Sequence, residues 1–158
     1  MDYWNSTKIN LKKAWQLSGA ERWLLVQASL ALPLVALGLR CWGLCRLQAR
    51  LNQGEALAPH LSALKSDLDQ ARATARLVQV AARYGLFRPT CLPRSLVLWW
   101  LLRRQGLAGE LRIGVKPEPS RLEAHAWVEF QGQPLNDGAN VAGRFPPFPR
   151  EIIPPAAP

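Results

Sequence analysis

Cysteine, histidine and acidic residues are all scarce in this chain of 158 residues. Three cysteines are too few, and odd in number, for a disulfide-stapled scaffold, which favours a reducing cytosol. Only 11 acidic residues stand against 20 lysines and arginines, so the formal net charge is +9. That charge favours acidic partners such as nucleic acid, anionic lipid or an acidic peptide. With 49% hydrophobic residues the chain is too apolar for global disorder, and its length suits one domain.

The chain also lacks internal repeats, a phosphate loop of the GxxxxGK[ST] kind and any recognised nucleic-acid-binding motif. Its basic residues are scattered, which disfavours nucleic acid as the partner. Without a phosphate loop we expect no direct ATP site, and we expect no cofactor. Cys41 and Cys45 lie four residues apart without further ligands nearby, so we expect helix packing there and no metal site.

One stretch near the N-terminus, residues 23–39, contains no charged residue and is flanked by Arg22 and Arg40. This stretch of 17 residues is at the lower limit for a membrane span, which needs about 20. It starts too late for a signal peptide, and no cleavage site follows it. Three alternatives stay open: a buried or partner-facing helix, a helix on a membrane surface, and a span. We therefore expect a cytoplasmic protein, with membrane association as an open alternative.

Glycine and proline divide the chain. A break over residues 52–59 contains Gly54 and Pro59 and predicts a boundary after the N-terminal region. The expected parts are an apolar and basic helical region, a core region and a proline-rich tail: residues 1–54, 55–149 and 150–158.

The core region is predicted to be α+β. Apolar residues three and four positions apart indicate a helix over 61–84, ended by Gly85. A second, strongly apolar helix is expected over 91–105, with Pro93 in its first turn and the Thr90 hydroxyl available as its cap. Alternating branched and aromatic residues then predict the strands of a small antiparallel sheet: 110–115, 124–130 and 134–137.

Cys91 is expected at the N-terminus of the second helix. The helix dipole and the unpaired N–H groups there lower a thiol pKa toward the reactive thiolate. Arg88 and Arg94 add positive charge nearby, and the same N–H groups are suited to hold an oxyanion. The alternative for a free cysteine is a small buried hydrophobe.

His125 lies inside the second predicted strand, between two alanines. Strand alternation puts Trp127 and Glu129 on the same face, while the alternate residues resemble a core face. His125 is thus held on a rigid strand, and a structural histidine is the alternative.

The position of Asp137 relative to His125 depends on the hairpin loop between the last two strands. A three-residue loop, 130–132, places Asp137 opposite His125 on the same face, where it can orient the imidazole. A two-residue loop places Asp137 on the opposite face. We expect the three-residue loop, with Asn136 as the alternative orienting residue.

A cysteine at a helix N-terminus, followed by histidine and aspartate on adjacent strands, is typical of the papain and transglutaminase superfamily. The blocks CLPRSLVLWWLLRRQG, LRIGV, AHAWVE and PLND, within about residues 71–149, closely resemble the transglutaminase-like proteins of lasso-peptide biosynthesis. Those proteins are cysteine proteases that remove the leader from a ribosomally made precursor in antibiotic biosynthesis. The resemblance implies Cys91 as nucleophile, His125 as general base and Asp137 as orienting acid.

The resemblance also implies partners. Residues 1–85 do not show the alternating strands of a leader-recognition domain, so we expect a stand-alone protease with a separate recognition protein. The precursor peptide and the ATP-using macrolactam synthetase complete the expected set. Trp127 and Glu129, on the His125 face, are expected to contact substrate. In one departure, residues 116–123 (KPEPSRLE) stand where the family has a short Pro-Phe segment before the histidine.

Two alternatives to a leader peptidase remain. One is a transglutaminase-like amidase or acyltransferase acting on another substrate, because a fold does not fix a function. The other is a non-catalytic, basic adaptor on a membrane surface.

Overall fold

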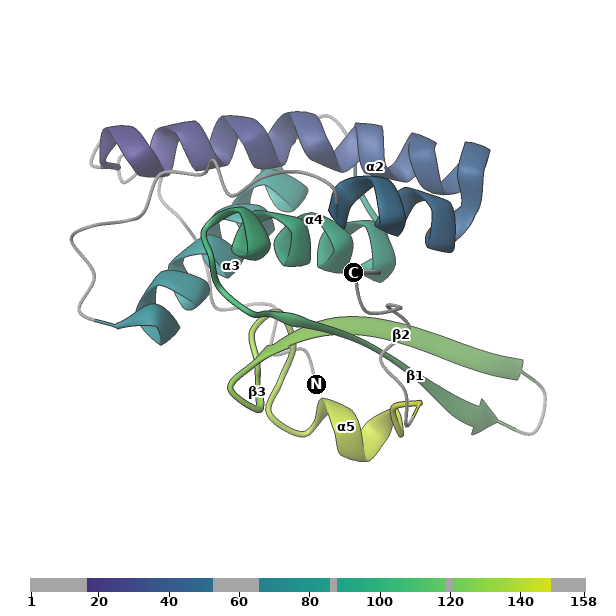
Figure 1. Cartoon of the computed structure of the whole chain (residues 1–158). Coiled ribbons are helices and arrows are strands. Elements are labelled where there is room, and N and C mark those ends of the chain that lie inside the picture. The colour runs from purple at the N-terminus through teal and green to yellow at the C-terminus, as the bar shows by residue number, and fades with distance from the viewer. Residues whose placement is uncertain (1–16, 53–65, 86–87, 119–120, 149–158) are drawn as a thin grey trace, which may run out of the picture.

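The computed structural model describes residues 17–52, 66–85, 88–118 and 121–148. Its elements, in chain order, are α2 (Gly19–Asn52), α3 (Asp67–Tyr84), α4 (Cys91–Arg104), β1 (Glu110–Glu118), β2 (Arg121–Phe130), β3 (Gln133–Pro134) and α5 (Val141–Arg144). They form layers (Figure 1): α2 lies on one side of α3 and α4, and the sheet and α5 lie on the other. The fold is α+β, as predicted. Apart from Asn52, the expected break at 52–59 and the tail at 150–158 lie outside the described residues.

α2 is one face of the helical core. Leu24, Ala28 and Leu32 are buried within the same cluster as residues of α3 and α4. The helix turns back on itself at Gly43, whose φ of 73° lies in the left-handed region that favours glycine. This turn makes the prediction for Cys41 and Cys45 wrong: both are exposed, because the turn separates them and no continuous helix face carries the pair.

α3 and α4 are joined by buried polar side chains. Gln105 Oε1 accepts hydrogen bonds from Gln70 Nε2 and from Thr74 Oγ1, each 3.0 Å long. The bonds fix the C-terminal end of α4 against the first two turns of α3. α3 ends at Tyr84, next to Gly85, as predicted, while residues 61–65 of the expected helix lie outside the described residues.

α4 begins at Cys91, as predicted, with Pro93 in its first turn. Thr90 is the N-cap residue, but its side chain makes no capping hydrogen bond, so the expected hydroxyl cap is absent. Trp99 is fully buried in the core, and Trp100 is partly buried against it.

The sheet has the order β1-β2-β3 and is antiparallel. β1 and β2 are longer than predicted, because residues 116–118 and 121–123 continue the pairing outward on both strands. The loop from β2 to β3 contains two residues, Gln131 and Gly132, and Phe130 pairs with Gln133. The predicted three-residue loop is therefore wrong. Gln131 adopts a positive φ of 51° and Gly132 one of 73°, as in a tight type I′ turn. Glutamine is not a residue that predicts a positive φ, so the sequence did not indicate this turn.

Candidate active site

The site forms where β2 loses its neighbour. β3 ends at Pro134, so the edge of β2 beyond it is covered by other groups. Ser95 Oγ, in the first turns of α4, donates to the carbonyl of Ala126 at 2.9 Å. Asn136 Oδ1 accepts from the N–H of Val128 at 2.8 Å, and Asn136 Nδ2 donates to Ser95 Oγ at 2.9 Å. Two side chains thus bind the β2 backbone in place of a strand and fix the start of α4 against it.

This attachment sets Cys91, the first residue of α4, beside His125 on β2. A hydrogen bond with His125 lowers the pKa of the Cys91 thiol; burial opposes this, and backbone hydrogen bonds with Ala126 and Leu92 lower the pKa further. Arg94, one helical turn onward, is close enough that its charge interacts with Cys91, although burial lowers its own pKa. The thiol therefore ionises more readily than a free cysteine.

His125 is hydrogen-bonded to Asp137. Its Nε2 lies 2.5 Å from Asp137 Oδ2, which leaves Nδ1 as the nitrogen for Cys91. The bond with Asp137, and after it the bond with Cys91, raises the pKa of His125 to about 9 although burial lowers it. The imidazole is therefore mostly protonated at neutral pH, next to a thiol that ionises readily.

The Asp137 carboxylate is held from a second side. Its Oδ1 accepts hydrogen bonds from the N–H of Gly138 at 2.7 Å and from Arg144 Nη2 at 2.8 Å. Burial raises the pKa of Asp137, but the bonds from His125 and Gly138, with the charges of His125 and Arg144, outweigh it and keep that pKa low. The side chain is only 5% exposed.

The structure brings Cys91, His125 and Asp137 together. Asp137, however, lies in a loop and not on the third strand, where the predicted register placed it. Val128 is the last β2 residue bound by the returning backbone, through the N–H of Leu135 at 2.9 Å. The chain then leaves the sheet, and Asp137 reaches His125 from a loop. With the two-residue turn, a third strand that continued to position 137 would place Asp137 on the sheet face opposite His125. Because β3 ends at Pro134, Asp137 is not held to that face.

Trp127 and Glu129 lie on the same strand as His125 and make contacts within the protein beside it. Trp127 is fully buried, and its ring stacks with that of His125 at a centroid distance of 6.2 Å. Its Nε1 donates to Glu129 Oε1 at 2.8 Å, while Glu129 Oε2 pairs with Arg112 Nε at 3.3 Å. Both side chains are thus occupied within the protein, and Trp127 leaves no exposed surface for a substrate.

A close backbone crossing completes this face. Gly114 of β1 pairs with His125, and a Cβ on Gly114 would lie 2.4 Å from the carbonyl oxygen of Phe145. The absence of a side chain lets the segment after α5 cross β1, where the N–H of Phe148 donates to Ile113 at 3.0 Å. The Phe145 ring then packs 4.9 Å from the His125 ring. A glycine within a strand was the available signal for this crossing.

A readily ionised thiol beside a protonated, carboxylate-bound imidazole is suited to nucleophilic attack on a carbonyl. Within the described ranges, no group of three or more His, Cys, Asp or Glu side chains is placed to hold a metal ion. The thiol, the imidazole and the carboxylate together are suited to acyl transfer through a thioester.

Comparisons with known proteins agree with this fold. Microcin J25-processing protein McjB of Escherichia coli is 33% identical over 61 residues, which cover 39% of this chain and 28% of that protein. The alignment thus spans well under a third of that relative. No solved structure matches the chain. The family model described as the transglutaminase-like superfamily matches residues 32–149, which include Cys91, His125 and Asp137, and the chain belongs to that superfamily.

Proposed function

We propose that this chain is a cysteine peptidase that removes the leader from a ribosomally synthesised lasso-peptide precursor. The observation that carries the proposal is the hydrogen-bonded series Cys91, His125 and Asp137 at the junction of α4 and β2. Two likenesses point to the substrate. The motif blocks resemble leader peptidases of lasso-peptide biosynthesis, and the Escherichia coli relative is named for processing microcin J25.

In the proposed reaction the Cys91 thiolate attacks the scissile carbonyl carbon and forms a C–S bond. The N–H groups at the start of α4 are suited to stabilise the oxyanion. The C–N bond breaks as His125 gives its proton to the leaving amine. Neutral His125 then takes a proton from water, the hydroxide attacks the thioester, and the thiolate leaves.

Asp137 is proposed to orient the imidazole and to stabilise its protonated form. Its two oxygens are divided between His125 and the pair formed by Gly138 and Arg144. This division fixes the carboxylate, so the histidine ring has one favoured orientation toward Cys91. The role matches that of the buried aspartate in other nucleophile–histidine–acid sites.

The proposed partners follow from the same resemblance. A separate recognition protein would bind the leader and present the precursor to this chain, and the macrolactam synthetase would act on the released core. The proposed location is the cytoplasm, where ribosomal precursors are made and free thiols persist.

The direct test is cleavage of the precursor, mixed with its recognition protein and followed by mass spectrometry. We expect leader release by the wild type and a loss of more than about a thousandfold for Cys91→Ala. Cys45→Ala is the matched control, because Cys45 is an exposed free cysteine of the same chain, and it should cleave like the wild type.

Each other outcome has a defined meaning. Equal cleavage by the wild type and Cys91→Ala would remove Cys91 from the reaction. A modified acyl product, formed with an added amine in place of hydrolysis, would assign the site to an acyltransferase. No reaction by the wild type, with the recognition protein shown to bind, would favour another substrate or a non-catalytic adaptor.

A further inference from the structure

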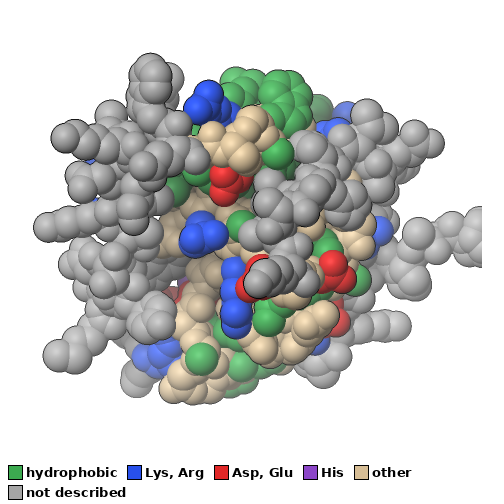
Figure 2. Space-filling view, turned by 90° about the vertical axis from the view of Figure 1, so that its left-hand side faces the viewer, with side chains coloured by type: hydrophobic (Ala, Val, Ile, Leu, Met, Phe, Trp, Pro, Cys, Tyr) green, Lys and Arg blue, Asp and Glu red, His purple; other side chains and the backbone are tan. Residues whose placement is uncertain are grey.

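The outward side of α2 carries an apolar stripe that stays exposed. Its members recur at intervals of three and four residues, so they share one side of the helix, opposite the buried face. Leu30 and Leu34, near its middle, are 63% and 66% exposed. Figure 2, which looks at α2 from one end, shows a group of hydrophobic side chains at the top of the molecule, where α2 lies. The stripe comprises Trp23, Val26, Leu30, Leu34 and Leu37.

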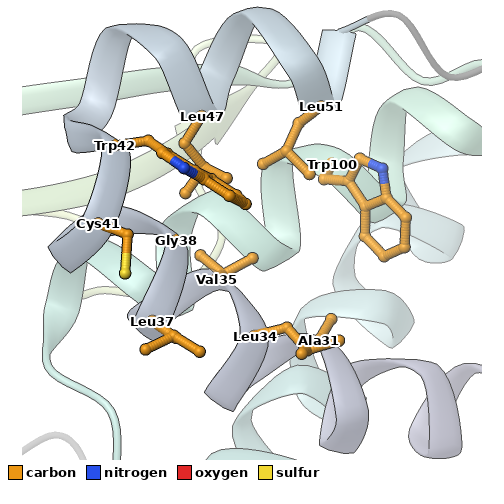
Figure 3. A pocket seen from close by; sticks show the side chains of 10 residues that line it. All are labelled: Ala31, Leu34, Val35, Leu37, Gly38, Cys41, Trp42, Leu47, Leu51 and Trp100. Carbon is orange, nitrogen blue, oxygen red and sulfur yellow. The ribbon is translucent and has the colours of Figure 1, made fainter.

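An apolar hollow of about 360 Å³ adjoins this stripe (Figure 3). It lies between the two halves of α2, on either side of the turn at Gly43, and one indole from α4 also lines it. Leu34 and Leu37 belong to both the stripe and the hollow, so the two form one continuous apolar surface. Further lining residues are Trp42, Leu47, Leu51 and Trp100.

Positive charge borders this surface. Arg22 and Arg40 lie directly before Trp23 and directly after Leu39, so each end of the apolar stretch carries an arginine. Arg50, from the returning half of α2, places its guanidinium 4.6 Å from the centre of the Trp42 ring. Within residues 17–52 the sequence has four arginines against one acidic residue, Glu21. The border is therefore complementary to an anionic surface.

α2 is long and apolar enough to cross a membrane by composition, with a mean hydropathy of 1.8 over its most apolar window. Its inner face argues against crossing, because Leu24, Leu32 and Val35 are buried among residues of α3 and α4. A spanning helix would have to leave that core. A helix buried on one side and apolar on the other is instead suited to lie in the plane of a membrane surface.

We propose that the outer face of α2 binds anionic phospholipid membranes, with the stripe at the acyl boundary and the bordering arginines on headgroup phosphates. Tryptophans near both ends of the apolar stretch favour lipid as the occupant, since indole rings prefer the interface between headgroups and acyl chains. Because α3 and α4 separate α2 from the sheet (Figure 1), the strand that carries His125 faces away from the bound membrane.

The test is sedimentation of the full chain with vesicles of phosphatidylglycerol and phosphatidylethanolamine, beside vesicles of phosphatidylcholine alone. We expect binding to the anionic vesicles, with a blue shift of tryptophan emission, and weakening as salt rises from about 0.1 M to about 1 M. The double variant Leu30→Gln and Leu34→Gln should bind at least about tenfold more weakly. Arg22→Gln with Arg40→Gln should weaken binding to the anionic vesicles.

The matched control is Leu122→Gln with Tyr84→Gln. It removes two apolar side chains, 67% and 53% exposed, from places outside the stripe, and it should bind like the wild type. Absence of vesicle binding by the wild type would overturn the proposal. Equal binding by the variant Leu30→Gln with Leu34→Gln would also overturn it. So would a stable dimer in lipid-free solution that this variant converts to monomers, since the stripe would then be the interface with a second copy of the chain.

Discussion

Gly114 positions the His125 ring indirectly, because it has no side chain and another segment can pack closely against it. The segment Phe145–Phe148 crosses β1 at this residue, and the Phe145 ring reaches His125 only because nothing projects from Gly114. Fixing the imidazole from this side leaves one ring face packed and one edge bound to Asp137. The orientation of His125 therefore depends on a residue with no side chain.

We expect Gly114→Ala to lower the free energy of unfolding by about 1–3 kcal/mol. The new Cβ would lie 2.4 Å from the Phe145 oxygen and 2.9 Å from the Pro146 oxygen, and both are backbone atoms that cannot rotate away. Gly19→Ala is the control, because a Cβ there meets nothing within 4 Å. Thermal denaturation of both variants measures the difference, and equal stabilities would contradict the close crossing.

Single residues were the part of the site most open to prediction. The placement of Cys91 followed from Pro93, which a helix tolerates only in its first turn, and that of His125 followed from strand alternation. Asp137 was chosen correctly as the neighbour of His125, but through a wrong register. The end of β3 at Pro134 is followed by long-range contacts of Asn136 with Ser95 and Val128, which no local sequence pattern records.

Among the elements, the junction of α4 and β2 carries the most structural consequence. Ser95 and Asn136 occupy hydrogen-bonding positions that a longer β3 would have filled. Because these side chains bind the β2 backbone in place of a strand, the chain can leave the sheet after Leu135. The sequence offered Asn136 only as an alternative to Asp137 and gave Ser95 no role, because the need for either side chain arises from the missing strand.

We expect Ser95→Ala and Asn136→Ala each to cost about 1–3 kcal/mol of stability, since each leaves a partly or fully buried partner group unsatisfied. Both should also slow the reaction of Cys91, because the start of α4 is no longer tied to Ala126 or Val128. Thr90→Ala is the control, as its hydroxyl makes no capping bond. Denaturation midpoints and single-turnover rates test this; wild-type rates in both variants would refute the positioning role.

At the scale of the whole molecule, α2 is a structural layer with one face in the core and one face outward. From the composition of residues 23–39, a buried or partner-facing helix was favoured, with a membrane-surface helix and a span as open alternatives. Only packing against α3 and α4 distinguishes the two sides of the helix. The division of the chain at residue 54 stays a prediction, and the response of the whole fold to changes in α2 tests it.

Leu32→Ala should destabilise the entire chain by about 2–5 kcal/mol, because Leu32 is 2% exposed and its removal leaves a cavity in the shared core. Leu34→Ala, two residues along and 66% exposed, should change stability by less than about 0.5 kcal/mol. Urea unfolding followed by circular dichroism compares them. A separate early transition in Leu32→Ala, with the rest of the fold unaffected, would show that α2 folds independently.

The most direct test of the central claim, that His125 and Asp137 activate Cys91, is the rate of Cys91 alkylation as a function of pH, followed by mass spectrometry. The pKa of Cys91 is lowered and that of His125 is raised to about 9, and both shifts favour the pair of thiolate and imidazolium over the neutral pair. We predict rapid alkylation of Cys91 near pH 6, ahead of the exposed Cys41 and Cys45. In His125→Ala this reaction should shift to higher pH, and in Asp137→Asn the pKa of His125 should fall from about 9. Alkylation of all three cysteines at equal rates, or an unchanged profile in His125→Ala, would contradict the account.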